Sequence, residues 1–298
     1  MSDFIHHTVC PVCGSASFTN NFSVKDFTVS QELFPIVECN SCSLRFTQDI
    51  PTPENSSRYY QSENYISHTN TSKGLINRIY LRVRNRTMIK KMKLIKKISG
   101  LKNGSLLDVG SGTGTFVNFM KENGWNVKGV EPDANAREVA RQTYHVELSD
   151  EKQLKEFSSA SFDVITLWHV LEHVYDLDNY LQQLKLLLKE DGKIFIAVPN
   201  YTSYDAHVYK KFWAAYDVPR HLYHFSPKSM KYLLEKNDLK LLHHKPMWYD
   251  SFYISLLSSK YKNQRTRWLA ALWKGFFSNL VAFFDVKRCS SLIYVAGK

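Results

Sequence analysis

The stretch that most constrains the fold is residues 106–116, with the sequence LLDVGSGTGTF. Apolar residues and an acid, Asp108, lead into a glycine-rich turn, and an apolar run follows. This order predicts a buried parallel strand, a tight loop and the start of a helix. Gly110, Gly112 and Gly114 let the backbone turn sharply and let a ligand approach main-chain N–H groups without a Cβ in the way. A glycine turn that holds no ligand is the alternative.

A second acid, Glu131, follows the next expected strand, residues 125–130. In an open parallel sheet, ligands bind at the carboxyl ends of the strands, where a carboxylate can accept hydrogen bonds from ribose hydroxyls. The spacing from Asp108 to Glu131 would serve a nicotinamide cofactor or S-adenosylmethionine. The dinucleotide fingerprint needs a third glycine three places after the second, and Thr115 stands there instead. The pattern therefore favours S-adenosylmethionine.

The stretch DVGSGTG resembles motif I of class I S-adenosylmethionine-dependent methyltransferases. The resemblance extends over about residues 103–198, with a last strand at 292–296. It implies that Glu131 binds the cofactor ribose, that the glycine loop lies under the amino-acid end, and that Leu148 approaches the adenine. The implied cofactor-binding residues are Asp108, Gly110, Ser111, Gly112, Gly114, Glu131, Pro132, Leu148, Trp168 and His169.

Alternating strand and helix patterns after residue 103 predict a Rossmann-like α/β fold, with helices on both faces of a doubly wound, seven-stranded sheet. The expected strands are 106–109, 125–130, 145–148, 162–167, 193–198, 239–244 and 291–296. The expected helices include 134–143 and 180–188. An insertion at about 251–287 separates the last two strands.

Four of the five cysteines form two C-x-x-C pairs, Cys10 with Cys13 and Cys39 with Cys42, separated by 25 residues. Four thiolates at this spacing can close a tetrahedral zinc site. A small or polar residue follows each pair and suits a tight turn, and alternating residues at 18–24 could form a strand between the pairs. We therefore expect a small zinc-binding β domain and a structural zinc ion, with a redox role as the alternative.

An aromatic segment, SRYYQSENYISH at residues 57–68, follows this domain. The pairing of the two resembles the N-terminal region of a bacterial methyltransferase group that includes zinc-bearing sugar C-methyltransferases. The resemblance implies that the segment forms part of the substrate pocket or a lid. A solvated linker is the alternative.

The net charge of +11 is concentrated in two stretches. Residues 51–102 carry 12 basic and 2 acidic groups, and residues 251–298 carry 8 and 1. In the first stretch, apolar residues recur at three- and four-residue spacing over 75–98, which predicts a long basic helix. A run of basic residues is most often a solvated helix face. The more specific functional interpretation is that the helix binds anionic lipid or nucleic acid.

The insertion in the second stretch holds an apolar run of about 17 residues that is rich in Trp and Phe. The run is short for a membrane span, and its basic flanks suit a helix at a membrane interface. A cover over a hydrophobic substrate and a homodimer face are the alternatives. We expect a cytoplasmic protein, because the chain shows no signal peptide. Peripheral contact with the inner face of the membrane through 75–98 and 265–288 is a further hypothesis.

The block WHVLEHV, residues 168–174, follows the fourth expected strand, where cofactor and substrate should meet. Continued as a helix, it would place His169, Glu172 and His173 on one face, which could supply a general base or a metal site. The block resembles the E-x-x-E-H block of ubiquinone-pathway O-methyltransferases, where such residues can hold a divalent ion. Here His169 replaces the first glutamate, and a packing role is the alternative.

The segment PRHLYHFSP, residues 219–227, resembles a recurrent block in small-molecule methyltransferases of this class. It gathers Arg220, His221 and His224 beyond the fifth strand, over the expected pocket. A histidine there could take a proton as the methyl moves, and Arg220 could clamp a carboxylate or phosphate. A structural loop that caps the next helix is the alternative. The candidate catalytic residues are thus His169, His221 and His224.

Together these features predict an S-adenosylmethionine-dependent methyltransferase in three parts: a zinc ribbon (1–50), an aromatic linker with a basic helix (51–102) and a methyltransferase domain (103–298). The expected acceptor is a small molecule, either lipidic, sugar or phenolic. An RNA methyltransferase is the first alternative. The ribbon, with 2 basic and 5 acidic groups, and the absence of an N/D-P-P-Y/F block make nucleic acid the weaker partner. A non-catalytic scaffold is the second alternative.

Overall fold

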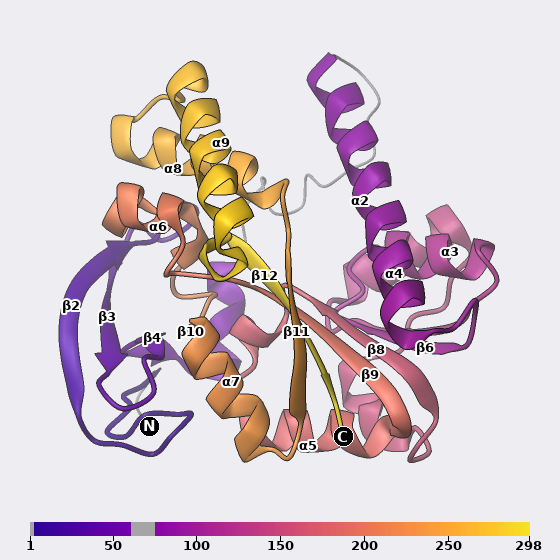
Figure 1. Ribbon diagram of the computed structural model, residues 1–298. Helices are drawn as coiled ribbons and strands as arrows, with labels where there is room; N and C mark the ends of the chain where they lie inside the picture. Colours follow the sequence, from indigo (N-terminus) through magenta and orange to yellow (C-terminus); the bar gives the residue numbers. More distant parts are fainter. Residues whose placement is uncertain (1–2, 61–74) are drawn as a thin grey trace.

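The computed structural model describes residues 3–60 and 75–298 and contains a large and a small β-sheet, with helices packed around the large one (Figure 1). Residues 61–68 of the predicted aromatic linker therefore lie outside the described residues. The large sheet has the strand order β11-β12-β9-β8-β6-β7. Its strands are β6 (Ser105–Val109), β7 (Asn126–Val130), β8 (Phe162–Trp168), β9 (Leu188–Pro199), β11 (Lys240–Pro246) and β12 (Ser291–Gly297).

Four neighbouring strands of the large sheet, β7, β6, β8 and β9, run parallel, whereas β12 runs antiparallel between β9 and β11. The central strands β6 and β8 are largely buried, which is why their sequences are almost continuous apolar runs. The register places Asp108 of β6 between Gly129 of β7 and Thr166 of β8. The carboxyl ends of these three strands therefore meet at one edge, as predicted for a Rossmann-like sheet.

Within the described residues, the large sheet has six strands, one fewer than predicted. Residues 145–148 form no strand, and Ser149 makes only an isolated bridge to Val130. His145 ends the preceding helix in a left-handed conformation, with φ of 53°. The chain therefore reaches the sheet edge only at Ser149, too late for a ladder to form.

Helices α3 (Thr115–Glu122), α4 (Ala134–Tyr144), α5 (Leu177–Leu187) and α7 (Pro227–Lys236) connect the strands. The predicted basic helix is α2 (Leu75–Ser99), and its Met88, Met92 and Ile95 pack with Leu106 and Phe116 in the core. The predicted insertion folds as α8 (Asp250–Asn263) and α9 (Trp268–Phe284). The remaining turns of helix are η1 (Pro53–Tyr59), η2 (Glu151–Glu156), η3 (Leu171–His173), α6 (Tyr204–Tyr209), η4 (Lys210–Phe212), η5 (Ala214–Tyr216) and η6 (Val286–Arg288).

The small sheet has the order β10-β4-β3-β2. Strands β2 (Phe18–Lys25), β3 (Leu33–Cys39) and β4 (Arg45–Thr47) come from the cysteine-bearing segment, which confirms the strand predicted at 18–24. The fourth strand of this small sheet, β10 (Tyr223–His224), comes from the segment that follows β9 of the large sheet. Nearby, β1 (Phe4–Ile5) pairs with β5 (Ile50–Pro51). The cysteine-bearing segment therefore shares a sheet with the rest of the chain.

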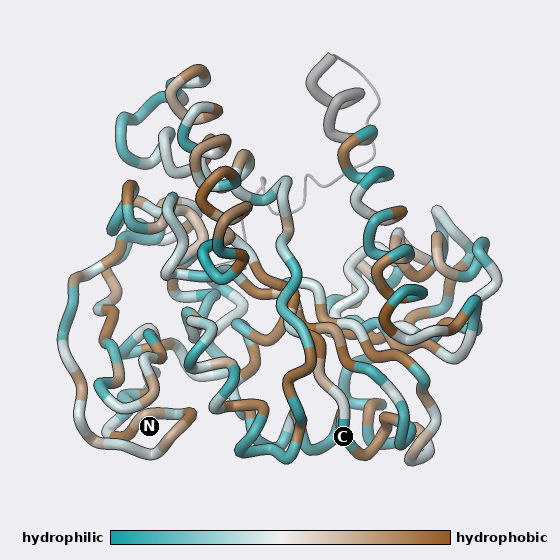
Figure 2. The backbone as a smooth tube through the Cα atoms, in the orientation of Figure 1, coloured by the Kyte–Doolittle hydropathy of each residue, from teal (hydrophilic) through white to brown (hydrophobic). Residues whose placement is uncertain are grey.

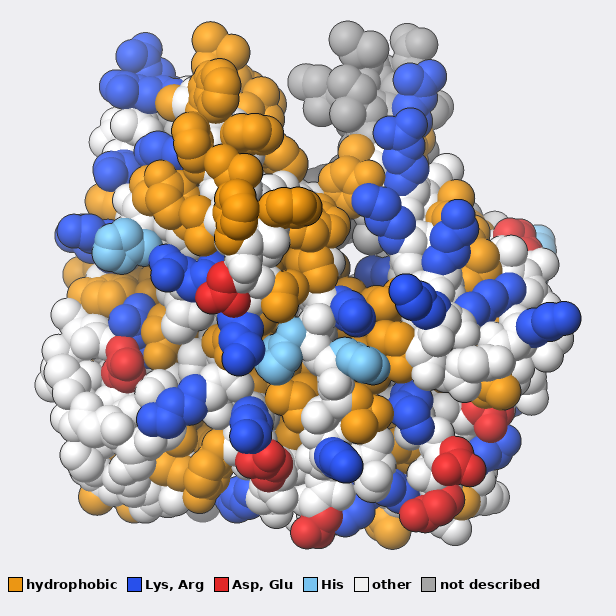
Figure 3. All heavy atoms as spheres, viewed as in Figure 1, with side chains coloured by type: hydrophobic (Ala, Val, Ile, Leu, Met, Phe, Trp, Pro, Cys, Tyr) orange, Lys and Arg blue, Asp and Glu red, His pale blue; other side chains and the backbone are white. Residues whose placement is uncertain are grey.

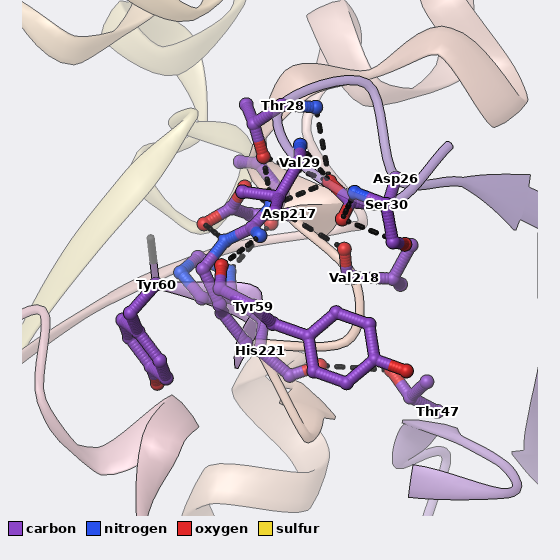
Figure 4. Close-up of polar contacts among 12 residues, drawn as sticks. Asp26, Thr28, Val29, Ser30, Thr47, Tyr59, Tyr60, Asp217, Val218 and His221 are labelled. Carbon is purple, nitrogen blue, oxygen red and sulfur yellow. Dashed lines mark hydrogen bonds and ion pairs between the residues drawn. The ribbon is translucent and has the colours of Figure 1, made fainter. Parts of the chain in front are cut away.

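A buried arginine joins the two parts of the molecule, and Figure 4 shows two acids that flank it, Asp26 and Asp217. Arg220, 3% exposed, lies between Asp26 in the turn after β2 and Asp217 in the loop after η5. Its guanidinium donates to Asp26 at 3.0 Å, to Asp217 at 2.7 Å and to the Tyr59 carbonyl at 2.7 Å, and it also contacts the Thr28 hydroxyl. Burial alone would raise the pKa of Asp26, but the bonds from Arg220 and nearby N–H groups hold that pKa well below its usual range.

The predicted role of Arg220 as a clamp for a substrate carboxylate or phosphate is therefore wrong. Its donors are used by groups of the protein itself, in a position closed to solvent. The alternative prediction for residues 219–227, a structural loop that caps the next helix, is confirmed. The Ser226 side chain caps α7, and Pro227 occupies the first turn of that helix.

Replacing Arg220 by Met should lower the free energy of unfolding by about 3–5 kcal/mol, because the buried Asp26 and the partly buried Asp217 lose their partner. Urea unfolding at neutral pH measures this loss. In a double-mutant cycle, Arg220→Met with Asp26→Asn should cost less than the sum of the single changes. The matched control, Arg141→Met, removes an exposed arginine of α4 and should not move the midpoint. An Arg220→Met protein with the wild-type midpoint would contradict the structural role.

Candidate functional site

The loop between β6 and α3 turns across the carboxyl edge of the large sheet. Gly110, Gly112 and Gly114 adopt φ values of 68°, 53° and 75°, in the left-handed region that favours glycine. A Cβ on Gly110 would overlap the side chain of Val170, and one on Gly114 would lie 2.8 Å from Ala140. A Cβ on Gly112 would meet nothing within 4 Å. The two outer glycines are thus required by packing, whereas Gly112 borders open space that a ligand could enter.

Two carboxylates border this loop. Glu131, at the end of β7, accepts hydrogen bonds from the backbone N–H of Gly112 at 2.7 Å and of Asp133 at 3.0 Å. Asp108 is 2% exposed and accepts from the Thr166 hydroxyl at 2.6 Å. Burial raises the pKa of Asp108 to about 6 and also raises the pKa of Glu131. A hydrogen bond that a ligand donates to either desolvated carboxylate would be stronger than the same bond in water.

The other residues expected to bind the cofactor surround the same loop. Ser111 donates its backbone N–H to the Val130 carbonyl at 3.0 Å. Leu148 lies 3.7 Å from the position of a Cβ on Gly114, and Pro132 directly follows the acid that borders the loop. The structure therefore brings these positions together at one edge of the sheet, and their contact with a cofactor stays a prediction.

A lysine that the sequence analysis missed also reaches this edge. The Lys91 ammonium of α2 lies 3.9 Å from the ring centroid of Trp168 and 5.6 Å from that of Phe116. Burial lowers the pKa of Lys91 to about 8, while Asp108 and Asp250 favour its charged form. An aromatic face close to carboxylates is a favourable place for a cation. The residues at this edge therefore suit a positively charged group.

His169 does not start a helix, so the predicted helical face of His169, Glu172 and His173 is wrong. Its φ is 59°, and only the short 3₁₀ turn η3 follows it. The His169 N–H donates to the Ala197 carbonyl of β9 at 2.9 Å, which continues the pairing of β8 and turns the chain away from a helix. The ring still lies 3.3 Å from Glu172 through Nδ1 and 3.0 Å from the Asp250 carboxylate through Nε2.

These two carboxylates decide the charge of His169. Burial alone would lower the pKa of its ring, but the hydrogen bonds to Asp250 and Glu172 outweigh burial and raise it to about 10. The ring is therefore protonated at neutral pH in this arrangement. A protonated imidazole donates two hydrogen bonds and cannot take up a proton, so His169 can orient both carboxylates but cannot act here as a general base.

Glu172 also belongs to a cluster with His173 and His221, in which one ligand atom of each residue lies within 4.8 Å of the others. His173 Nδ1 lies 3.0 Å from the Arg220 carbonyl, and His221 Nδ1 lies 2.8 Å from the Ala215 carbonyl. Because a carbonyl oxygen only accepts, each Nδ1 carries the proton and each Nε2 is left as an acceptor. Such a set could hold a divalent metal ion or take up a proton. This set differs from the predicted metal site of His169, Glu172 and His173, because His221 takes the place of His169.

His224 lies in the small sheet and is 3% exposed. Its Nε2 is 3.1 Å from the Thr47 hydroxyl, and its ring packs edge-on against Tyr216 at 4.9 Å between centroids. Burial lowers the pKa of His224 well below its usual value. The residue is a neutral packing element of β10, which corrects its predicted catalytic role.

Of the predicted aromatic linker, Tyr59 and Tyr60 lie within the described residues. Tyr59 is 1% exposed and donates its hydroxyl to Glu32 at 2.7 Å. The Tyr60 hydroxyl lies 3.4 Å from Nδ1 of His173, so this end of the linker borders the histidine cluster. The position agrees with a pocket wall, although the rest of that segment lies outside the described residues.

The four cysteines of the N-terminal segment converge on one point, with their sulfurs within 4.8 Å of one another. The Sγ atoms of Cys10 and Cys42 are 3.6 Å apart, and those of Cys13 and Cys39 are 3.4 Å apart. A tetrahedral site with Zn–S bonds of about 2.3 Å has S···S edges of about 3.8 Å. The donor set and its spacing therefore fit a structural zinc ion.

Residues 80–244 match the family model described as a methyltransferase domain. The chain belongs to this methyltransferase family. The predicted resemblance to class I S-adenosylmethionine-dependent methyltransferases is thereby confirmed, and the glycine loop and Glu131 fall within the matched residues.

Curated relatives of this methyltransferase cover only part of it. The ubiquinone biosynthesis O-methyltransferase of Glaesserella parasuis is 36% identical over an alignment of 118 residues, and the match covers 36% of this chain and 50% of that protein. The mitochondrial ubiquinone biosynthesis O-methyltransferase of Bos taurus is 28% identical over an alignment of 173 residues, and that match covers 53% of this chain and 46% of that protein. The chain thus spans about half the length of the curated relatives it matches.

Two solved structures are also similar. An S-adenosylmethionine-dependent methyltransferase from Archaeoglobus fulgidus has 20% identity and a TM-score of 0.48, over 72% of this chain and 94% of that one. The 1,6-didemethyltoxoflavin-N1-methyltransferase of Burkholderia thailandensis has 15% identity and a TM-score of 0.49, over 89% of this chain and 95% of that one.

The pairing of His169 with Asp250 can be tested by pH. The pKa of His169 is about 10 in the folded chain and about 6.5 in the unfolded chain. Its contribution to stability is therefore complete below pH 6.5 and is lost as the pH rises through about 10. NMR titration of labelled imidazoles should show the His169 ring still charged at about pH 8, and Asp250→Asn should lower its pKa.

The matched control for this titration is Asp191→Asn, which removes an exposed carboxylate on β9 and should leave the His169 titration unchanged. A wild-type His169 ring that lost its proton near its ordinary pKa would contradict the two hydrogen bonds.

Proposed function

We propose that this methyltransferase transfers a methyl group from S-adenosylmethionine to a small-molecule acceptor. The glycine loop with Glu131 carries the proposal, because Gly112 borders open space and Glu131 lies beside it with a desolvated carboxylate. Glu131 would accept hydrogen bonds from the ribose hydroxyls, and the N–H groups of the loop would face the amino-acid end. S-adenosylmethionine, when bound, supplies an electrophilic methyl group on a positively charged sulfur.

The chain's own part is to align the donor with the acceptor and to keep water out. The aromatic face of Trp168 and the buried Asp108 favour a positive charge at the end of β8. In this structure the ammonium group of Lys91 lies there. His221, 9% exposed and with Nε2 left as an acceptor, is our candidate for accepting a proton from the methyl acceptor. His169, which is protonated, would orient Glu172 and Asp250.

The acceptor we propose is a small lipidic, sugar or phenolic compound. The relatives are named as ubiquinone biosynthesis O-methyltransferases, which favours a phenolic hydroxyl. A hydroxyl acceptor needs a group that takes its proton. Glu172 and His173 of the histidine cluster follow β8, which runs parallel to β6, the strand that leads into the glycine loop. Methyl transfer to panels of phenols, sugars and quinone precursors, followed by mass spectrometry, would identify the acceptor.

Cofactor binding is the first measurement, by calorimetry with S-adenosylmethionine and S-adenosylhomocysteine. Glu131→Ala should weaken binding about 10- to 100-fold, because it removes charge-assisted hydrogen bonds worth about 1.5–3 kcal/mol. Gly112→Trp should abolish binding, because its side chain would fill the open space at the loop. The control Glu190→Ala, at an exposed glutamate of β9, should bind as the wild type does. Failure of the folded, zinc-loaded wild type to bind either compound would favour a non-catalytic scaffold.

We propose that Cys10, Cys13, Cys39 and Cys42 hold one structural zinc ion. Purified protein should contain one zinc per chain by elemental analysis, and Cys39→Ser should lose it. The same variant should unfold at lower denaturant concentration, because metal binding contributes to folding. Cys289→Ser, which changes a buried cysteine outside the set, should keep its zinc. Full zinc content in Cys39→Ser would exclude this site.

A further inference from the structure

Helix α9 carries its large apolar residues on the side that faces solvent. The residues it buries are small: Ala271, Gly275, Ser278 and Ala282. Their spacing of four, three and four residues places them on one side of the helix. The opposite sides carry large apolar residues that are 41–81% exposed: Trp268, Leu269, Leu272, Trp273, Phe276, Phe277, Leu280, Phe283 and Phe284. A surface helix of a globular protein ordinarily has the reverse arrangement.

The small side of α9 is fitted closely to the rest of the protein. A Cβ on Gly275 would lie 2.9 Å from the Phe252 ring and 3.1 Å from the Ser251 carbonyl of α8. The Ser278 hydroxyl donates to the buried Asp205 at 2.6 Å. These contacts fix which side of the helix faces inwards, so the outward position of the aromatic side chains is built into the fold.

These nine exposed side chains, the α9 patch, form a continuous apolar surface. Figure 2 shows the hydrophobic stretch along α9, and Figure 3 shows its side chains gathered on one face of the molecule. An apolar patch of this extent on a water-exposed surface marks a site of interaction with a protein or a membrane.

The positive charge around the α9 patch favours an anionic partner. Lys260 and Lys262 lie in the last turn of α8, and Arg265 and Arg267 lie between α8 and α9. The only acid in residues 251–298 is Asp285. Helix α2 contributes further Lys and Arg side chains to the same face in Figure 3. Two copies of the chain that met through this patch would bring like charges together. An anionic surface would instead be attracted to the basic rim.

We propose that the α9 patch docks on an anionic lipid membrane, with its Trp, Phe and Leu side chains at the boundary of headgroups and acyl chains and its basic rim on the lipid headgroups. Among the described residues, no helix is both long enough and apolar enough to cross a bilayer. The contact is therefore peripheral, through a helix that lies in the plane of the interface. This inference does not depend on methyl transfer, although it would bring the sheet edge near lipidic acceptors.

The test is co-sedimentation of the full chain with two kinds of vesicle. Binding to phosphatidylcholine vesicles that contain phosphatidylglycerol should exceed binding to phosphatidylcholine alone and should fall with added salt. Replacing Trp273 and Phe277 together by Glu should weaken binding about tenfold or more, because two exposed aromatic side chains that would insert into the lipid are lost. The matched control changes two exposed leucines elsewhere, Leu33→Glu with Leu186→Glu, and should bind as the wild type does.

Two further measurements separate a membrane from a second copy of the chain. Brominated lipids should quench the fluorescence of Trp268 and Trp273 in the wild type, and circular dichroism should confirm that the Glu variant is folded. Analytical ultracentrifugation should give the same oligomeric state for the wild type and the Glu variant. Equal binding to both kinds of vesicle, unchanged binding by the folded Glu variant, or a dimer through this patch without vesicle binding would overturn the proposal.

Discussion

The ion pairs of Arg220 with Asp26 and Asp217 hold together segments of the chain that are up to 194 residues apart. They fix the segment between Asp217 and β10, which the small sheet also binds through the Thr47 N–H and the Leu222 carbonyl at 2.9 Å. The same segment carries His221 to the histidine cluster. The small sheet therefore supports the position of a candidate proton acceptor.

The features that the sequence predicted well depend on short-range patterns. The strand, loop and helix around Gly110, the acid at Glu131 and the paired cysteines are each encoded within about thirty residues, and their geometry follows from parallel-sheet and turn chemistry. Helix α2 was predicted for the same reason, since Met88, Met92 and Ile95 repeat at helical spacing. Lys91 falls at that spacing too, three residues after Met88, but a run of basic residues gave no reason to single it out.

The features that could not be predicted depend on distant partners. His169 meets Asp250, 81 residues away, and this contact changes the expected base into a protonated ring. His224 and Arg220 belong to a segment that looks suited to catalysis, yet β4 holds His224 in the core, and the carboxylates of Asp26 and Asp217 hold Arg220 there. Residue type alone cannot distinguish a buried arginine from one that binds substrate, because the difference lies in which acids the fold brings to it.

The same reasoning applies to α9, because its apolar run could be predicted from the sequence but the direction of its faces could not. Small residues and large residues both fit the core of a protein, so composition could not show that Gly275 and Ala271 would face inwards. The charge distribution also bears on how the molecule would orient at an anionic surface. Residues 1–50 carry 2 basic and 5 acidic groups, whereas residues 251–298 carry 8 basic groups and 1 acidic group. An anionic surface attracts the second segment and repels the first, so the electrostatic field of the whole chain would turn the α9 patch toward a membrane before any apolar contact forms.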